Sequence, residues 1–118
     1  VNDNLYKTIS FGWSVLKYVK SNAILVAKDC TTLAIGAGQV SRVDSVDIAI
    51  NKLKGDVENA VLFSDAFFPF RDSLDKLAET SIKTVVQPGG SLRDNEVIDA
   101  CNEHGISMLF TDVRCFKH

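Results

Sequence analysis

Three short segments of the sequence combine conformationally special residues with charged side chains, a composition that suits ligand binding. The first, residues 35–42, contains Gly36 and Gly38 and ends on Arg42. Glycine permits a tight turn and a close approach of the backbone, and the free amide groups at a helix start attract anions. Arg42 adds a bidentate donor for carboxylate or phosphate. A plain glycine turn with a solvent-facing arginine remains the alternative.

The second segment, residues 64–72, reads Ser-Asp-Ala-Phe-Phe-Pro-Phe-Arg-Asp. Exposing its aromatic rings would cost about 25 cal/mol per Å² of apolar area, so the rings either turn into the core or line a pocket for a flat heterocycle. Asp65 and Asp72 could accept hydrogen bonds from ring nitrogens. Asp72 could equally serve only as a helix cap. The segment therefore predicts either a heterocycle pocket or an aromatic core plug.

The third segment, residues 87–94, reads Gln-Pro-Gly-Gly-Ser-Leu-Arg-Asp and again joins a predicted strand to a predicted helix. Its alternative interpretation is an ordinary turn. In an open α/β sheet, ligands collect at the carboxyl ends of strands, where loops lead into helices. All three segments are predicted to lie at that position.

The elements that would position these segments follow from apolar spacing. Apolar residues at three- and four-residue steps over residues 5–19 predict a helix, although Gly12 weakens its middle. Residues 24–28 and 31–35 predict a hairpin that turns at Asp29-Cys30. After Ser41, apolar residues from Val43 to Leu53 predict a second helix.

The remaining sequence alternates strands with helices. Residues 61–63, 84–86 and 106–110 predict strands, and helices are expected after Asp72 and after Ser91. Gly105 is placed to end the last helix. The order α-β-β-α-β-α-β-α-β predicts an α/β sheet covered by helices, and residues 1–118 read as a single domain.

Composition excludes several classes of function. The net charge of −2 provides no basic footprint for nucleic acid, and no apolar run approaches the roughly 20 residues that a membrane helix needs. Cys30, Cys101 and Cys115 form neither a disulfide framework nor a zinc pair, which favours reduced thiols in a cytosolic protein. Zinc-dependent deaminases share this element order, but the sequence has neither an HxE nor a PCxxC pattern, so no zinc is expected.

The histidines and the first residue provide weaker signals. His104 precedes Gly105 at a predicted helix end, where an imidazolium suits the helix dipole, so a structural role is expected. His118 is terminal and could be functional or frayed. Val1 in place of an initiating Met suggests a piece of a longer chain, although processing could also remove Met.

Five motifs in order carry a family resemblance. They are Lys-Ser-Asn-Ala-Ile at residues 20–24, Ile-Gly-Ala-Gly-Gln with Ser41-Arg42, Ser-Asp-Ala-Phe-Phe-Pro-Phe, Gln-Pro-Gly-Gly-Ser, and the closing Thr-Asp-Val-Arg-Cys-Phe-Lys-His. Essentially the whole chain resembles the C-terminal part of the bifunctional enzymes that join AICAR transformylase to IMP cyclohydrolase. The resemblance implies a cytidine-deaminase-like three-layer α-β-α domain, the second half of the transformylase region. It also implies a cytoplasmic, intertwined homodimer that transfers a formyl group from 10-formyltetrahydrofolate to AICAR.

The resemblance also implies roles for individual residues. Asn22 would hydrogen-bond the AICAR base, and Arg114 would reach the nucleotide phosphate. Arg42 would lie on the folate side, where Phe67 and Pro69 would form a wall of the pocket.

A pterin hydrogen bond and a cation site are implied as well. Asp72 would hold the pterin-like ring of the folate, while Asp65, with main-chain carbonyls near Ser21, would bound a site for a monovalent cation such as K⁺.

One element of the family's chemistry is missing from the sequence. The Lys-His pair that serves acid–base work in the family belongs to the other half of the region, and Lys117-His118 is the C-terminal tail. Loss of proton transfer would lower the rate by about 10²- to 10⁴-fold or more, so the chain alone is expected to be inactive. The alternative is a stand-alone nucleotide- or folate-binding module without catalysis.

Overall fold

The order of helices and strands agrees with the one that the apolar spacing predicts. The computed structural model describes residues 3–19, 23–29, 31–38, 42–53, 57, 59–65, 72–88 and 94–111. Within these residues the elements are α1 (Asp3–Leu16), β1 (Ile24–Lys28), β2 (Thr31–Gly36), α2 (Arg42–Asn51), β3 (Val61–Ser64), α3 (Asp72–Leu77), β4 (Thr84–Gln87), α4 (Asp94–His104) and β5 (Ser107–Phe110). The predicted α-β-β-α-β-α-β-α-β order is confirmed, and the bounds differ from the predicted ones by a few residues.

The described strands form one mixed sheet in the order β2-β1-β3-β4-β5. β1 runs antiparallel to both of its neighbours, whereas β3, β4 and β5 run parallel to one another. The hairpin between β1 and β2 turns at Asp29, whose φ of 51° lies in the left-handed region that aspartate tolerates better than most residues. Cys30, the other predicted turn residue, lies outside the described residues.

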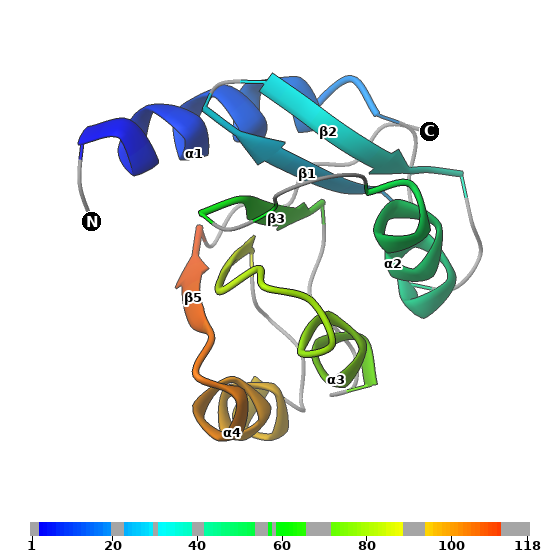
Figure 1. Ribbon diagram of the computed structural model, residues 1–118, viewed down its shortest axis with the longest axis vertical. Coiled ribbons are helices and arrows are strands. Elements are labelled where there is room, and N and C mark those ends of the chain that lie inside the picture. The colour runs from blue at the N-terminus through cyan, green and yellow to red at the C-terminus, as the bar shows by residue number, and fades with distance from the viewer. Residues whose placement is uncertain are drawn as a thin grey trace.

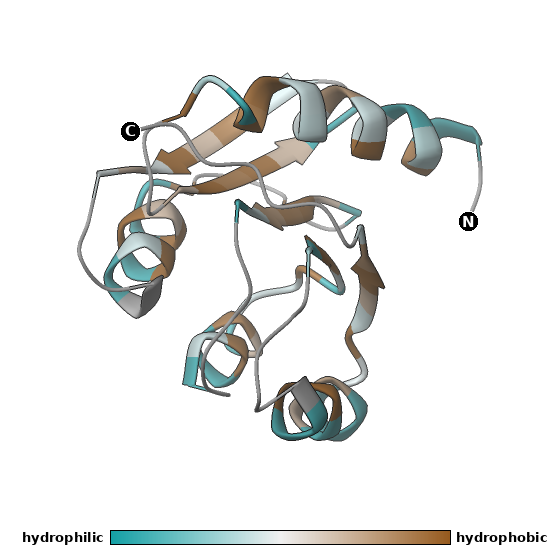
Figure 2. Ribbon diagram, turned by 180° about the vertical axis from the view of Figure 1, so that it is seen from behind, coloured by the Kyte–Doolittle hydropathy of each residue, from teal (hydrophilic) through white to brown (hydrophobic). Residues whose placement is uncertain are grey.

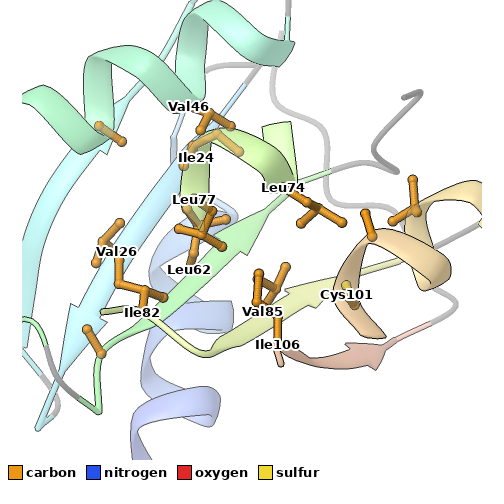
Figure 3. Close-up of a cluster of buried hydrophobic side chains, with 14 of the residues drawn as sticks. Ile24, Val26, Val46, Leu62, Leu74, Leu77, Ile82, Val85, Cys101 and Ile106 are labelled. Carbon is orange, nitrogen blue, oxygen red and sulfur yellow. The ribbon is translucent and has the colours of Figure 1, made fainter. Parts of the chain in front are cut away.

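Helices cover both faces of the sheet and create two apolar layers. α1 lies on one face, and α2, α3 and α4 lie on the other (Figure 1). Residues of one strand alternate between the layers: Leu25 and Phe63 pack toward α1, while Ile24 and Leu62 face the other helices. Hydrophobic residues accordingly concentrate on the strands in Figure 2, and Figure 3 shows the larger layer between the sheet and α2, α3 and α4.

Gly12, which weakened the sequence case for α1, has a packing role. A Cβ atom at this position would overlap the ring of Phe63 in β3. The missing side chain therefore lets α1 lie directly on the sheet, and Leu16, one turn later, is fully buried in the same layer. The contact with Phe63 offsets the lower helix propensity of glycine.

The C-terminus of α4 ends as the position of Gly105 predicts. Gly105 has a φ of 67°, and the next residue, Ile106, donates its backbone N–H to the carbonyl oxygen of Cys101 at 2.9 Å. This bond and the left-handed glycine together form the Schellman end of a helix. The side chain of His104, in the last turn, contacts Asp75 of α3, with 2.8 Å between Nε2 and Oδ1, in line with its expected structural role.

We expect Gly12→Ala to destabilise the protein although alanine favours helices. Alanine would gain about 1 kcal/mol of helix propensity, but the overlap with a buried ring costs about 1–3 kcal/mol and requires the core to shift. Urea denaturation of Gly12→Ala should show a lower free energy of unfolding. Ser14→Ala, at an exposed position of the same helix, is the control and should change it by about 0.5 kcal/mol or less. An equally stable Gly12→Ala variant would contradict the packing role.

We expect Cys101 to resist alkylation in the folded protein. It is free and buried in the core, and burial raises the pKa of its thiol to about 11. At pH 8 the thiolate is then a fraction of about 10⁻³, and the thiolate is the reactive form. Mass spectrometry after iodoacetamide treatment should find the Cys101 peptide unmodified without denaturant and modified in urea. Rapid modification of the native protein would show that α4 opens readily.

Candidate functional site

The polar ends of the strands meet at one edge of the sheet. Because β1 runs antiparallel to β2 and β3, its first residue, Ile24, pairs with the last residue of each neighbour, Gly36 and Ser64. On the other side of β3, Gln87 at the end of β4 pairs with Phe110 at the end of β5. We call the residues 23, 36–38, 64–65, 87–88 and 110–111 the carboxyl edge. The three sequence segments singled out for ligand binding all leave the sheet at this edge.

Backbone hydrogen bonds extend the pairing just beyond the strands at this edge. Asp65 donates its N–H to the carbonyl oxygen of Ala23 at 3.3 Å, and Thr111 donates to the carbonyl oxygen of Gln87 at 2.9 Å. The residues from which the loops depart are therefore held in fixed positions relative to one another. Such a fixed base is what a ligand site on loops requires.

Three polar side chains at the carboxyl edge are fully buried. Ser64, Asp65 and Gln87 each have an exposed fraction of 0%. Removing a polar group from water is costly unless it finds partners, and for a carboxylate the cost is larger still. The carboxamide of Gln87 donates from Nε2 to the sulfur of Met108 at 2.9 Å. The edge thus contains a buried carboxyl group beside other buried hydrogen-bonding groups.

Ser64 and Gln87 were not singled out individually by the sequence reasoning. A signal was present, because each is a polar residue that ends a strand directly after two or more apolar residues, in Val-Leu-Phe-Ser and Thr-Val-Val-Gln. Their burial depends on the helices that cover both faces of the sheet, which local sequence does not report. Asp65, by contrast, was predicted as a cation ligand, and the structure places it at the carboxyl edge.

The first ligand segment makes an unusually close contact between β2 and α2. A Cβ atom on Gly36 would overlap the backbone carbonyl oxygen of Ser45 in α2. Gly38 has a φ of 70°, so the predicted glycine turn is confirmed there. Lys52, just after α2, donates from Nζ to the carbonyl oxygen of Ile35 at 2.8 Å and ties α2 back to β2.

Arg42 is the first residue of α2, directly after this turn. Its backbone position agrees with an arginine at a helix start, and its side chain lies outside the described part of the structure.

Asp72 is the first residue of α3. Its Oδ1 accepts a hydrogen bond from the backbone N–H of Ser73 at 2.9 Å, and its side chain is exposed. An N-cap side chain accepts from the second or third N–H of the helix, so this contact with the next residue leaves both interpretations of Asp72 as predictions. The neighbouring Ser73 hydroxyl is buried and has no hydrogen-bond partner, a state found for no other side chain among the described residues.

The other predicted site residues lie outside the described residues. These are Ser21, Asn22, Phe67, Pro69 and Arg114. Their nearest described neighbours in the chain are Ala23, Asp65, Asp72 and Thr111, of which three belong to the carboxyl edge. Cys30, Cys115 and His118 also fall outside the described residues.

Neither a metal-binding cluster nor a membrane helix is found among the described residues. In this part of the chain, no group of three or more His, Cys, Asp or Glu side chains lies close enough together to hold a metal ion. No helix there has the length and apolar character needed to cross a membrane.

The sequence is similar to known proteins over nearly its whole length. The family model described as AICARFT/IMPCHase bienzyme matches residues 1–52. The bifunctional purine biosynthesis protein PurH of Aquifex aeolicus (strain VF5) is 60% identical over 111 residues, which make up 92% of this chain and 22% of the relative. The protein of the same name from Rhodopirellula baltica is 54% identical over 118 residues, 100% of this chain and 23% of the relative. The chain thus spans less than a quarter of the length of these relatives.

Solved structures support the fold. The dCMP deaminase of the cyanophage S-TIM5 in its apo form superposes with a TM-score of 0.63 and 16% identity, over 91% of this chain and 96% of the deaminase. The second structure is a diaminohydroxyphosphoribosylaminopyrimidine deaminase/5-amino-6-(5-phosphoribosylamino)uracil reductase from Thermotoga maritima. It superposes with a TM-score of 0.53 and 21% identity, over 91% of this chain and 35% of the reductase chain. The cytidine-deaminase-like fold expected from the sequence is confirmed by these neighbours.

We expect Gly36→Ala to loosen α2 from the carboxyl edge. The added methyl group would meet a backbone carbonyl, which cannot rotate away as a side chain can, so we expect a loss of about 2 kcal/mol or more in the free energy of unfolding. The control is Gly105→Ala, where a Cβ atom meets nothing within 4 Å and only the positive φ is unfavourable, at about 1 kcal/mol. Equal losses for the two variants, measured by urea denaturation, would contradict the close contact.

Proposed function

Because this chain belongs to the AICARFT/IMPCHase bienzyme family, we propose that its carboxyl edge is one part of a formyl-transfer site. The reaction moves the formyl group of 10-formyltetrahydrofolate to the 5-amino group of AICAR in the synthesis of purines. High identity to PurH relatives supports the pathway. The choice of the transformylase over the cyclohydrolase rests on the co-linear motifs at residues 20–24, 35–42, 64–70 and 87–91 and on the closing residues 111–118.

One structural observation carries the proposal: all five strands present their ligand segments at the same edge. The antiparallel β1 places Ile24 beside both Gly36 and Ser64, so the points at which these segments join the sheet are neighbours. Transfer between two substrates needs both of them in one place, and correct positioning can lower the barrier by about 7–11 kcal/mol. A common edge from which nucleotide-side and folate-side residues both depart meets that requirement.

The folate side of the site would be built from residues around β3 and α2. Phe67 and Pro69 lie in the segment that joins Asp65 to Asp72, and we propose that they form a wall against the flat pterin-like ring. Arg42, at the start of α2, would face the folate. The carboxylate of Asp72, at the start of α3, is exposed and would accept a hydrogen bond from the ring.

The nucleotide side would be built from the segments that flank β1 and β5. Asn22, immediately before Ala23, would hydrogen-bond the AICAR base. Arg114, three residues after Thr111, would bind the nucleotide phosphate as a bidentate donor.

A monovalent cation fits the chemistry of the carboxyl edge. Asp65 provides a fully buried carboxyl group there, and carboxyl and carbonyl oxygens are the ligands that hard cations prefer. We propose that Asp65 and main-chain carbonyls near Ser21 and the C-terminus would hold K⁺, which would supply positive charge next to the base of the loops.

The chain by itself would bind the substrates weakly, if at all, and would not turn them over. In the reaction the bond from the formyl carbon to N10 of the folate breaks as a bond to the AICAR amine forms, and the amine loses a proton that the folate nitrogen gains. The aminoimidazole amine is a poor nucleophile, so this proton transfer needs an acid–base group. The family's Lys-His pair is not found in residues 1–116, and Lys117-His118 closes the chain. We therefore assign the acid–base step to the rest of a longer protein or to a partner, with a cytoplasmic homodimer as the expected assembly.

A second candidate is a nucleotide- or folate-binding module without catalysis. The same observation favours it, because a site with positioning residues and no Lys-His pair can bind both substrates but not move the proton. Recovery of activity with an added Lys-His segment separates the two candidates.

We expect no formyl transfer from 10-formyltetrahydrofolate to AICAR by this chain alone. Activity should appear when the remaining, Lys-His-bearing part of the Aquifex aeolicus relative is added. Arg42→Ala should lower the recovered rate by about tenfold or more, because a charge-assisted contact is lost. Lys17→Ala, at an exposed position after α1, is the control and should leave the rate unchanged. Turnover by the chain alone would overturn the assignment of the acid–base group, and no recovery would favour the binding module.

A further inference from the structure

A polar hollow lies at the end of the sheet opposite to the carboxyl edge. It has a volume of about 320 Å³, within the range of pockets that hold small molecules. Its walls come from the start of α1, the end of β1, and the residues that lead into β3 and β4, and they include Lys28, Asp29, Asn59, Ser81, Lys83 and Thr84. β3 spans four residues, so about 13 Å of strand separates the hollow from the carboxyl edge. The hollow is therefore distinct from the proposed formyl-transfer site.

The charged side chains around the hollow favour an anion. Lys28 and Lys83 contribute two positive charges, and Asp29 contributes one negative charge. The Oδ1 atom of Asp29 already accepts a hydrogen bond from Nδ2 of Asn4 at 2.7 Å, which occupies part of its capacity. The described residues of the lining have a net charge of about +1 at neutral pH, on a chain whose net charge is −2. The hollow is a local positive site on an acidic protein.

Lys83 is able to turn toward a ligand at low cost. Its Nζ atom lies 3.5 Å from the backbone carbonyl oxygen of His104, at the outer limit of a hydrogen bond. A contact of that length is weak, so exchanging it for a charge-assisted bond to an anion is favourable. Lys83 directly precedes β4, whose pairing with β3 and β5 fixes its backbone.

Neutral donors complete the lining. Ser81, Thr84 and Asn59, whose side chains carry hydroxyl or amide donors, line the hollow together with the two lysines. Asn59 has a φ of 68° and Asp29 has a φ of 51°, and both line the hollow. Asp29 follows β1 and Asn59 precedes β3, and asparagine and aspartate are the side-chain-bearing residues best suited to this left-handed conformation.

We propose that this hollow is a binding site for a small phosphate-bearing molecule. Lysine ammonium groups bind phosphate as point charges, and hydroxyl and amide donors can complete the contacts of its several oxygens. A single carboxylate would use fewer of these donors. None of the residues that line the hollow belongs to the carboxyl edge, so the site is distinct from the proposed formyl-transfer site.

The test is an NMR titration of the ¹⁵N-labelled 118-residue chain with inorganic phosphate, against chloride at matched ionic strength. Saturable shifts of the amide signals of Asn59, Lys83 and Thr84 with phosphate, and not with chloride, are expected. Lys83→Gln should weaken the binding of phosphate by about fivefold or more, and Lys28→Gln should act in the same direction. The matched control, Lys17→Gln, removes an equal charge from the other end of α1 and should leave the affinity unchanged.

Three results would overturn the proposal. The first is shifts that grow without saturation, and the second is equal shifts with chloride, since each would indicate only screening of surface charge. The third is equal weakening by Lys17→Gln and Lys83→Gln, because net charge rather than the hollow would then control the binding. These outcomes do not depend on whether the proposed formyl-transfer function is correct. The titration uses inorganic phosphate alone and does not measure formyl transfer.

Discussion

The antiparallel placement of β1 between β2 and β3 is the constraint on which the rest of this structure depends. It aligns the start of β1 with the carboxyl ends of its neighbours, through the pairing of Ile24 with both Gly36 and Ser64. It also places β1 and β3 in the centre of the sheet, where nearly all of their residues are buried on both faces. One pairing choice thus creates the two-sided core and gathers the ligand segments at a common edge.

Glycines determine how closely the helices approach this sheet. Gly12 gives up helix propensity so that α1 can contact Phe63, and Gly36 lets α2 lie against the end of β2. Both contacts tie a helix to a strand of the central core, and the second lies at the carboxyl edge itself. The position of the proposed site therefore depends on the absence of two Cβ atoms as much as on any polar group.

The two ends of the sheet differ in chemistry. The carboxyl edge holds polar side chains that are fully buried, including the carboxylate of Asp65, and suits positive groups or donors. The opposite end holds a solvent-accessible hollow with two lysines and suits an anion. In a parallel arrangement such as β3 to β5, the two ends carry different loops, so the same strands can support two sites without conflict. The proposed formyl-transfer site and the proposed phosphate site follow this division.

The sequence by itself determined the order of elements and the segments that carry ligand chemistry. Apolar spacing, the turn at Asp29 and the helix end at Gly105 are local features, because each depends on residues within one or two turns of the chain. The five motifs were sufficient to indicate the family. Gly12 was misleading in the sequence, because helix propensity counts only the destabilising effect of a glycine. It does not include the ring of Phe63, against which Gly12 packs in the folded chain.

Only the tertiary structure decided the order β2-β1-β3-β4-β5, the burial of Ser64 and Gln87 and the hollow that Lys28 and Lys83 line. The physical reason is that these features join residues far apart in the sequence. Burial in particular requires both helical layers to be in place. For Asp72, the sequence allowed a cap and a ligand-binding carboxylate, and the hydrogen bond from Ser73 leaves most of the carboxylate's accepting capacity for either role.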